Sequence, residues 1–369
     1  MAHKEIGNSF AQIVLPSTSL NEDITFFTGV GFRLDNIYPS DDPAVAMMSG
    51  NGLHIVLDVN SKTSPASIHI RTDEPQVFGG ERELKAPNGS VIRIVPRSYR
   101  LELPETQHKF EVRRLRDSDP WVIGRAGMLY RDLIPDRLGG SIIASHIRIP
   151  NGGPVPDMVH YHTIGFQLIF CYRGWVKLVY EDQGPPFVLK EGDCVTQPPE
   201  IRHRVLEASE NVEVIEIGVP AEHMTTIDHE LELPTKTFKP DRVFKGQVFC
   251  HHEVSKATWH PWRIDGFEFR ETGVSKATRG VASVHVARPA APDIQTGTLI
   301  HDGDILFTFV MEGEVTLNGE DLGAIKLKRG DAFVIPPNFK HRLCNNSDDL
   351  ELLEVSLPGD FQTTVLDQK

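Results

Sequence analysis

The sequence predicts a mainly β protein in which two tandem β-barrel domains follow a small α+β module. The first observation is an internal repeat: Pro198-Pro-Glu-Ile-Arg-His203 returns as Pro336-Pro-Asn-Phe-Lys-His341, at an offset of 138 residues (341 − 203). The second is the frequency of turn formers, 26 Pro and 30 Gly, between short runs of β-branched and aromatic residues. The third is that no helical period of ten or more residues occurs between Gly127 and Val219. Two copies of one β fold account for all three observations.

Each copy contains a hairpin. Gln167 to Tyr172 is expected to form a strand, Arg173-Gly174 turns the chain, and Trp175 to Tyr180 returns. Glycine supplies the left-handed conformation that such a turn needs. In the second copy Ile305 to Met311 precedes a turn at Glu312-Gly313. We therefore expect an N-terminal module at 1–98, a first barrel at 99–225 and a second barrel at 226–369.

The segment from Pro220 to Pro261 links the two copies. Its lysines, prolines and acidic residues predict a surface crossover with one or two short strands. We expect its histidines, His223, His251 and His252, to be solvated rather than catalytic.

The first hundred residues differ from both copies. Strand candidates at Phe10–Leu15, Phe32–Ile37, Val45–Ser49 and Leu53–Asp58, with a short acidic helix after the first, give the order βαβββ. With Phe26-Phe27 before Gly29-Val-Gly31-Phe32, and a closing turn and strand at Ala86–Arg93, this module resembles the glyoxalase-type (vicinal oxygen chelate) family over residues 9–97. Its second half is shortened and lacks a helix.

The resemblance implies no metal catalysis in this module. The family's metal positions fall near Gln12, Ser67 and Arg93, which do not complete a site. The module could instead cover the first barrel, widen an intersubunit contact or bind a ligand.

Charge and composition restrict the class of protein. A formal net charge of −13 argues against nucleic acid as a partner, because a phosphate-binding surface needs clustered Lys and Arg. No run of about 18 uncharged apolar residues predicts a membrane span, and Met1 to Asn8 show no secretory signal. The four cysteines form no CxxC pair, so we expect free thiols in a reducing cytoplasm.

Four residues of the first copy predict a metal site. His160 and His162 are two positions apart on a predicted strand, so their side chains point to the same face. Gln167 follows on the next strand, with a parity that aims it inward, and His203 returns after the Gly192 turn. Three imidazoles and an amide oxygen suit a divalent transition metal. All four are neutral, so the ion would keep its full charge, although Gln167 as a spectator would leave a three-histidine site.

With its two histidines one residue apart, its glycine turn and its proline-linked third histidine, this constellation resembles the cupin superfamily. The resemblance covers residues 120–219 and 259–358 and implies two double-stranded β-helix (jelly-roll) barrels, a bicupin. The family pattern has a glutamate where this chain has Gln167. The resemblance further implies one divalent metal, for which we favour Fe(II) over Ni, Mn, Zn, Co or Cu, a small-molecule substrate, and a homo-oligomer.

The second copy departs from this pattern. Leu299 replaces the first histidine and Leu306 replaces Gln167, while His301 and His341 remain. We favour a degenerate, structural barrel over a weaker second metal site. His146 and His285 are expected to share one strand phase and to face outward or toward the domain junction.

The first barrel's chemistry remains open between classes. An open redox-active ion beside the apolar wall residues Ile169 and Cys171 favours a dioxygenase acting on an enolisable or aromatic oxygenated substrate. The alternatives are a non-redox metal lyase, isomerase or cyclase, and a non-enzymatic protein that binds a small molecule. No confident general base is visible in the sequence.

Overall fold

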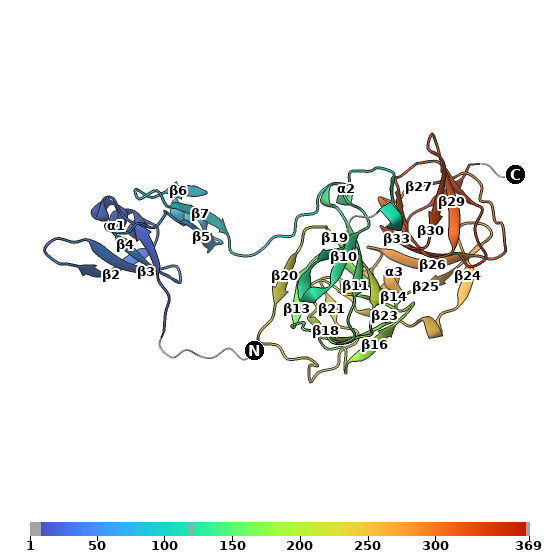
Figure 1. The fold of residues 1–369 in the computed structure, drawn as a ribbon, viewed down its shortest axis with the longest axis horizontal. Helices are drawn as coiled ribbons and strands as arrows, with labels where there is room; N and C mark the ends of the chain where they lie inside the picture. The colour runs from blue at the N-terminus through green and yellow to red at the C-terminus, as the bar shows by residue number, and fades with distance from the viewer. Residues whose placement is uncertain (1–8, 118–120, 367–369) are drawn as a thin grey trace. The chain divides into compact units, whose positions relative to one another are not determined.

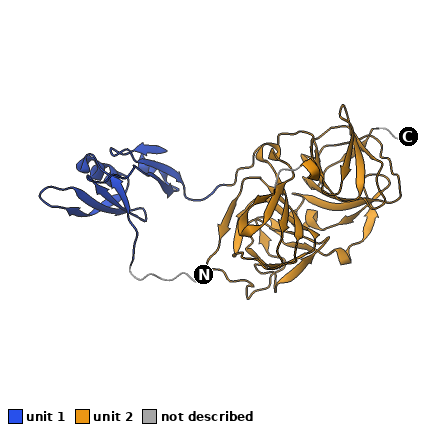
Figure 2. Ribbon diagram, in the orientation of Figure 1, with its two compact units in different colours: residues 1–100 blue, residues 101–369 orange. Residues whose placement is uncertain are grey.

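The computed structural model describes residues 9–117 and 121–366, so the predicted absence of a signal at residues 1–8 lies outside the described part. The chain divides into two compact units, residues 1–100 and 101–369 (Figure 2). Within the described residues no helix has the length and apolar character needed to cross a membrane.

The first unit opens with the predicted βαβββ order. Its elements are β1 (Ile13–Pro16), α1 (Leu20–Gly29), β2 (Phe32–Tyr38), β3 (Val45–Gly50) and β4 (Leu53–Asp58). The strands form one sheet in the order β1-β4-β3-β2, with β1 parallel to β4. The second half is short: β5 (Ser67–Thr72), β6 (Glu83–Lys85) and β7 (Val91–Pro96) form a three-stranded sheet, with a single 3-10 turn, η1 (Pro75–Phe78), between β5 and β6.

Asp23 joins the two halves of this unit. Its carboxylate accepts hydrogen bonds from the hydroxyl of Ser17 at 2.6 Å and from the backbone N–H of Asn88 at 2.9 Å. Phe27 and Ile92 are fully buried in the core that both sheets share. Burial of such side chains from both sheets makes the unit one hydrophobic body.

The second unit contains both barrels, shown in Figure 1 as green to yellow-green strands beside orange and red strands. Barrel 1 comprises a seven-stranded sheet, β23-β17-β14-β19-β11-β10-β9, and a six-stranded sheet of which the main path is β16-β15-β18-β13-β20 and β12 pairs with β18. Its strands are β9 (Val122–Ile123), β10 (Leu129–Asp132), β11 (Ile143–Ile149), β12 (Gly153–Pro154), β13 (His160–Thr163), β14 (Phe166–Arg173), β15 (Trp175–Tyr180), β16 (Phe187–Lys190), β17 (Cys194–Thr196), β18 (His203–Ala208), β19 (Val212–Val219), β20 (Met224–Ile227) and β23 (Cys250–His252).

Barrel 2 repeats this plan. Its two sheets have the orders β24-β25-β26-β33-β28-β31-β8 and β30-β29-β32-β27-β34. Its strands are β8 (Glu111–Arg113), β24 (Trp259–Pro261), β25 (Phe267–Glu271), β26 (Ser283–Pro289), β27 (Leu299–His301), β28 (Ile305–Glu312), β29 (Glu314–Gly319), β30 (Gly323–Lys328), β31 (Ala332–Ile335), β32 (His341–Cys344), β33 (Glu351–Leu357) and β34 (Thr363–Val365). The remaining elements of this unit are η2 (Leu115–Asp117), η3 (Arg125–Gly127), α2 (Arg137–Gly140), β21 (Val243–Phe244), β22 (Gln247–Val248), η4 (Val254–Lys256) and α3 (Val274–Thr278). The tandem jelly-roll barrels predicted from the repeat are therefore present.

The barrels exchange edge strands. β8 precedes barrel 1 in the chain but pairs with β31 of barrel 2, and β23 precedes barrel 2 but pairs with β17 of barrel 1. A shared core lies between the two larger sheets, where Phe170 and Phe307 are fully buried. The predicted division at residues 225 and 226 stays a prediction, because chain order and sheet membership differ at this junction.

The residue-to-residue correspondence between the two barrels shifts by one position at β26. Arg131 pairs with His146, whereas the equivalent Arg270 pairs with Val286. His146 is buried at the barrel junction, but His285 turns toward Trp262, whose indole N–H donates to its Nδ1 at 3.3 Å. The prediction that His146 and His285 share one strand phase was therefore wrong.

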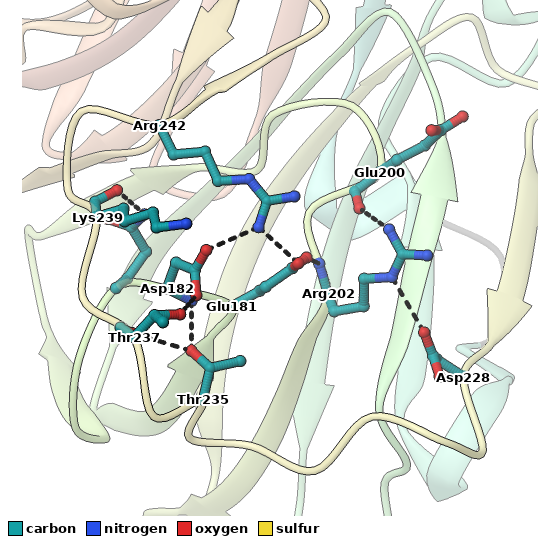
Figure 3. A network of polar contacts seen from close by, with 10 residues as sticks. Glu181, Asp182, Glu200, Arg202, Asp228, Thr235, Thr237, Lys239 and Arg242 are labelled. Atoms are coloured by element: carbon teal, nitrogen blue, oxygen red, sulfur yellow. Dashed lines mark hydrogen bonds and ion pairs between the residues drawn. The ribbon is translucent and has the colours of Figure 1, made fainter.

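Ion pairs attach the crossover segment, residues 220–261, to barrel 1 (Figure 3). Arg202 donates to Asp228 at 3.1 Å, and Arg242 donates to Glu181 at 2.7 Å and to Asp182 at 2.8 Å. Asp228 directly follows β20, which pairs with β13, the strand that carries the first two predicted ligands.

Candidate metal centre

The three predicted histidines meet inside barrel 1. His160 and His162 alternate along β13, and His203, the first residue of β18, is the direct cross-strand partner of His160. One ring nitrogen from each lies within 4.8 Å of the other two, and the three residues are buried. Nitrogens this close can share one ion, because each would bind it at about 2.1 Å.

Each imidazole is oriented through its Nδ1 atom. The Nδ1 of His160 donates to the carbonyl of Met158 at 2.8 Å, and that of His203 donates to the carbonyl of Ile201 at 2.9 Å. The Nδ1 of His162 lies 2.9 Å from the hydroxyl of Thr225 on β20. Such partners fix the ring and leave Nε2 to bind a metal. Nε2 of His160 is buried and has no hydrogen-bond partner among the described residues.

The pKa values of the three imidazoles determine whether they can bind a cation. Burial, followed by the proximity of the other imidazoles, lowers the pKa of His162 to about 2 and that of His203 well below its usual value. Burial and the Arg125 guanidinium also lower the pKa of His160. The three rings are therefore neutral near pH 7, the form in which imidazole binds metals.

Gln167 on β14, the predicted fourth ligand, is buried in barrel 1, and its coordination of a metal stays a prediction. Its amide N–H donates to a carboxylate oxygen of Glu216 at 2.6 Å, while its Oε1 is buried without a partner among the described residues. Buried polar atoms usually find partners, so the unpaired amide oxygen of Gln167 and the unpaired Nε2 of His160 are both compatible with a bound divalent ion.

Glu216 on β19 is the acidic residue that the sequence analysis missed. Its only signal was a glutamate in the otherwise apolar sequence Val214-Ile-Glu216-Ile-Gly218. Burial raises the pKa of Glu216, although the Gln167 hydrogen bond acts in the opposite direction. Glu216 contacts Gln167, but its carboxylate is not part of the cluster that the three histidine nitrogens form.

A cavity of about 70 Å³ opens onto the triad. Ile169 lines it as predicted from strand parity, whereas Cys171 is buried in the surrounding core and is not among the lining residues. Polar groups in the wall are Arg125 and Tyr130, besides Gln197 and Glu216. Burial raises the pKa of Tyr130 to about 12, so this phenol stays protonated. The lining residues are Arg125, Met128, Tyr130, Ile147, Ile149, His160, His162, Ile169, Val176, Leu178, Gln197, His203, Val205, Val214 and Glu216.

The crossover histidines are not freely solvated, contrary to prediction. The ring of His223 lies 5.4 Å from that of His162, centre to centre. His251 and His252 are half-buried on β23, and the ring of His251 stacks on Phe187 at 4.3 Å. The crossover therefore contributes to the surroundings of the triad.

The equivalent positions of barrel 2 do not form such a cluster within the described residues. His301 turns its Nε2 to the carbonyl of Ile335 at 3.0 Å, and His341 turns its Nδ1 to that of Phe339 at 3.0 Å. Leu299 and Leu306 fill the barrel core. That barrel 2 binds no metal stays a prediction, consistent with this arrangement.

The fold is a tandem pair of jelly-roll barrels, and the histidine triad forms a candidate metal centre in the first barrel. The sequence model of the cupin domain matches residues 291–356, within barrel 2. A structure of oxalate decarboxylase from Bacillus subtilis at pH 4.6 is similar over 74% of this chain and 81% of its own, with 14% identity and a TM-score of 0.51. The formate complex of oxalate decarboxylase from Lactobacillus farciminis is similar over 72% and 90%, with 13% identity and a TM-score of 0.51. Another Bacillus subtilis structure is described by its Mn(II) centres. At these identities the likeness concerns the fold, and no curated protein matched the sequence.

Proposed function

We propose that barrel 1 is a metal-dependent catalyst that converts a small anionic substrate without net oxidation, as a lyase or isomerase. The observation that carries this proposal is the position of Glu216. It is hydrogen-bonded to Gln167 in the cavity that the three histidines line. A carboxyl group beside an open metal site supplies a proton acceptor and donor where a Lewis acid polarises the substrate.

Charge favours an anionic substrate. The three imidazoles and the amide are neutral, so a bound divalent ion would keep its full charge. Arg125 adds a guanidinium to the same cavity wall, with its side chain 38% exposed. Because Arg125 is paired with the carboxylate of Asp157, the ion would supply most of the positive charge, and in a largely apolar cavity that charge would attract a carboxylate or an enolate.

Size restricts the substrate further. A cavity of about 70 Å³ has room for about five water molecules. A substrate of a few heavy atoms fits this space without opening the barrel, whereas a multi-ring aromatic does not. This favours small carboxylic acids over the aromatic substrates expected from the sequence.

The residues of the cavity would have different roles in catalysis. Arg125 would bind the substrate's anionic group, and the neutral phenol of Tyr130 would donate a hydrogen bond. Because its pKa is raised, Glu216 holds a proton at higher pH than an exposed glutamate and can deliver it to a carbon or oxygen of the substrate. The metal, held by His160, His162, His203 and Gln167, would supply Lewis acidity.

The similar solved structures support a non-redox reaction. They include oxalate decarboxylases, one described with formate and one with Mn(II). We therefore place Mn(II) before Fe(II) as the ion to test first, reversing the preference drawn from the sequence.

The test is turnover by metal-loaded protein with a panel of small mono- and dicarboxylic acids, followed by NMR of the substrate and by an oxygen electrode. We expect loss of substrate with far less than one dioxygen consumed per product. Wild-type protein that binds no divalent metal would rule out the proposal.

A dioxygenase is the second candidate, favoured by the apolar wall at Ile169, Met128 and Ile147 around an open, neutral donor set. Stoichiometric dioxygen uptake with diketones or catechols by iron-loaded protein would select it. Tight binding of a small acid without any turnover would select a binding protein instead.

For the N-terminal unit we propose a glyoxalase-type half-module without its own metal. Its sheet order supports this, and of the predicted metal positions Arg93 pairs with Glu83 at 3.1 Å while Gln12 is exposed. Association into a homo-oligomer remains a proposal, which the mass of the native protein in solution would test.

A further inference from the structure

Arg125 is held at the edge of the barrel 1 cavity by a buried carboxylate. Asp157, 6% exposed, forms an ion pair with the Nη1 atom of Arg125 and accepts the backbone N–H of Val205 at 2.9 Å through its other oxygen. Nη1 of Arg125 also lies 3.4 Å from Nδ1 of His160. The guanidinium thus lies behind the imidazole rather than among the atoms that face the ion.

Barrel 2 has an arginine in the corresponding turn, with a different partner. Arg263 precedes the buried Arg270 by seven residues, one more than the six that separate Arg125 from the buried Arg131, and both arginines lie just before the equivalent strands β25 and β10. The position of Asp157 is taken by Thr296. Its hydroxyl accepts the backbone N–H of Leu343 at 2.9 Å, as Asp157 accepts that of Val205. Threonine satisfies this backbone donor but has no charged oxygen left for an arginine.

Without that carboxylate Arg263 turns into the barrel. Its Nη2 donates to Glu354 at 2.5 Å and its Nε donates to the hydroxyl of Thr363 at 2.8 Å. Strand pairing makes Glu354 the equivalent of Glu216. Glu354 lies opposite Thr308, Glu216 lies opposite Ile169, and Thr308 and Ile169 occupy the same position of the repeat. Thr363 is the equivalent of Thr225, because they lie opposite His301 and His162.

One arginine therefore accounts for several differences between the barrels. In barrel 1 Thr225 is free to orient His162, and Glu216 is paired with Gln167. In barrel 2 both equivalents are bound to Arg263, and Nδ1 of His301 is buried without a partner among the described residues. A guanidinium at this place supplies the positive charge that an ion would otherwise supply.

We propose that Asp157 is a positioning residue that keeps Arg125 out of the ion site, and that its loss would convert barrel 1 to the arginine-filled state of barrel 2. The proposal rests on the metal centre of the proposed function. Released from Asp157, Arg125 would find in Glu216 the nearest carboxylate of the cavity wall, and its charge would then repel the ion.

The experiment measures Mn²⁺ affinity by isothermal titration calorimetry on the full chain. Asp157→Thr, which copies barrel 2, should weaken binding at least about tenfold, as expected for a residue that orients a metal site. Adding Arg125→Gln to Asp157→Thr should restore the affinity to within about threefold of wild type. A purely structural role for Asp157 would not be rescued by removing a second side chain.

Two variants control for folding. Asp331→Thr removes a carboxylate of similar burial that also accepts a backbone N–H, that of Leu115 at 2.8 Å, but lies in barrel 2. It should leave Mn²⁺ affinity unchanged. Asp157→Asn keeps an acceptor for Val205 and loses only the charge, so it should weaken binding even if Asp157→Thr does not fold.

The outcomes separate this proposal from the proposed function. Wild type that binds neither Mn²⁺ nor another divalent ion overturns both. Wild type that binds Mn²⁺, with Asp157→Thr and Asp157→Asn binding it equally well, overturns this inference alone. Weakened binding that Arg125→Gln fails to restore also overturns it.

Discussion

Barrel 1 and barrel 2 share their strand order, their hairpins and their proline-linked histidine, yet their interiors differ. Barrel 1 encloses three neutral imidazoles around a small cavity, whereas barrel 2 encloses leucines and the Arg263–Glu354 ion pair. The cupin sequence model matches residues 291–356, in the barrel without the triad. Turns and core residues therefore carry the sequence resemblance, and a few polar substitutions decide whether a barrel can hold an ion.

Removing the equivalent histidine from each barrel should separate the two barrels most clearly. His203→Ala takes away one of three clustered ligands, so we expect more than about a 100-fold loss of divalent-metal affinity. His341→Ala should leave the metal content unchanged, at one ion per chain. Elemental analysis and calorimetry measure both, and a metal loss in His341→Ala would mean that barrel 2 also holds an ion.

Replacing the two equivalent glutamates should change different quantities: turnover for Glu216 and stability for Glu354. Glu216→Gln should lower turnover by about 10²–10⁴-fold, the usual contribution of a general acid or base, with little change in stability. Glu354→Gln leaves the guanidinium of Arg263 without its carboxylate, so we expect a loss of about 3 kcal/mol in unfolding free energy and normal turnover. Denaturant unfolding and steady-state kinetics of both variants make the check.

Exchanging the amide position sharpens the assignment of Gln167. Gln167→Leu copies Leu306 of barrel 2 and removes both the amide oxygen and the partner of Glu216. We expect about a tenfold weaker metal affinity, because the three imidazoles remain. Leu306→Met is the matched control and should not alter metal binding. Unchanged affinity in Gln167→Leu would show that the ion uses the three histidines alone.

The smallest effect concerns acid stability in barrel 2. Burial lowers the pKa of His341 to about 4, from 6.5 in an unfolded chain. The unfolded state thus takes up a proton at higher pH than the folded state, so stability is full above about pH 6.5 and declines toward pH 4. The decline reaches about 1.4 kcal/mol at pH 5.5. In His341→Phe this part of the pH dependence should be absent from urea unfolding at pH 8 and pH 5.5. An identical slope in the variant would contradict it.

Much of the first barrel's centre could be predicted from sequence because most of its residues lie close together along the chain, on strands whose alternation is regular. His160, His162 and His203 follow from strand alternation and the proline-linked turn, and Gln167 from strand parity. The repeat also marked Leu299 and Leu306 as substitutions that fill barrel 2. These predictions used strand alternation, the internal repeat and the resemblance to the cupin pattern, all of which a single sequence contains.

Glu216, Arg125 and Thr225 were missed for a physical reason. They come from β19, from the turn before β10 and from the crossover, so only the closed barrel brings them beside the motif. The one-residue shift in β26 also escaped detection, because Ser145-His146 and Val284-His285 align well as letters. Pairing in three dimensions, not similarity along the chain, assigns these residues.

The exchange of β8 and β23 between the barrels has a consequence for dissecting the molecule. A fragment that ends near residue 225 would lack β23 and leave one side of β17 without hydrogen bonds, while its own β8 would have no sheet to join. The unpaired β8 of one fragment could then form hydrogen bonds with the open edge at β17 of a second fragment. Such fragments should therefore assemble with each other or precipitate, so that neither barrel can be studied as an independent folding unit.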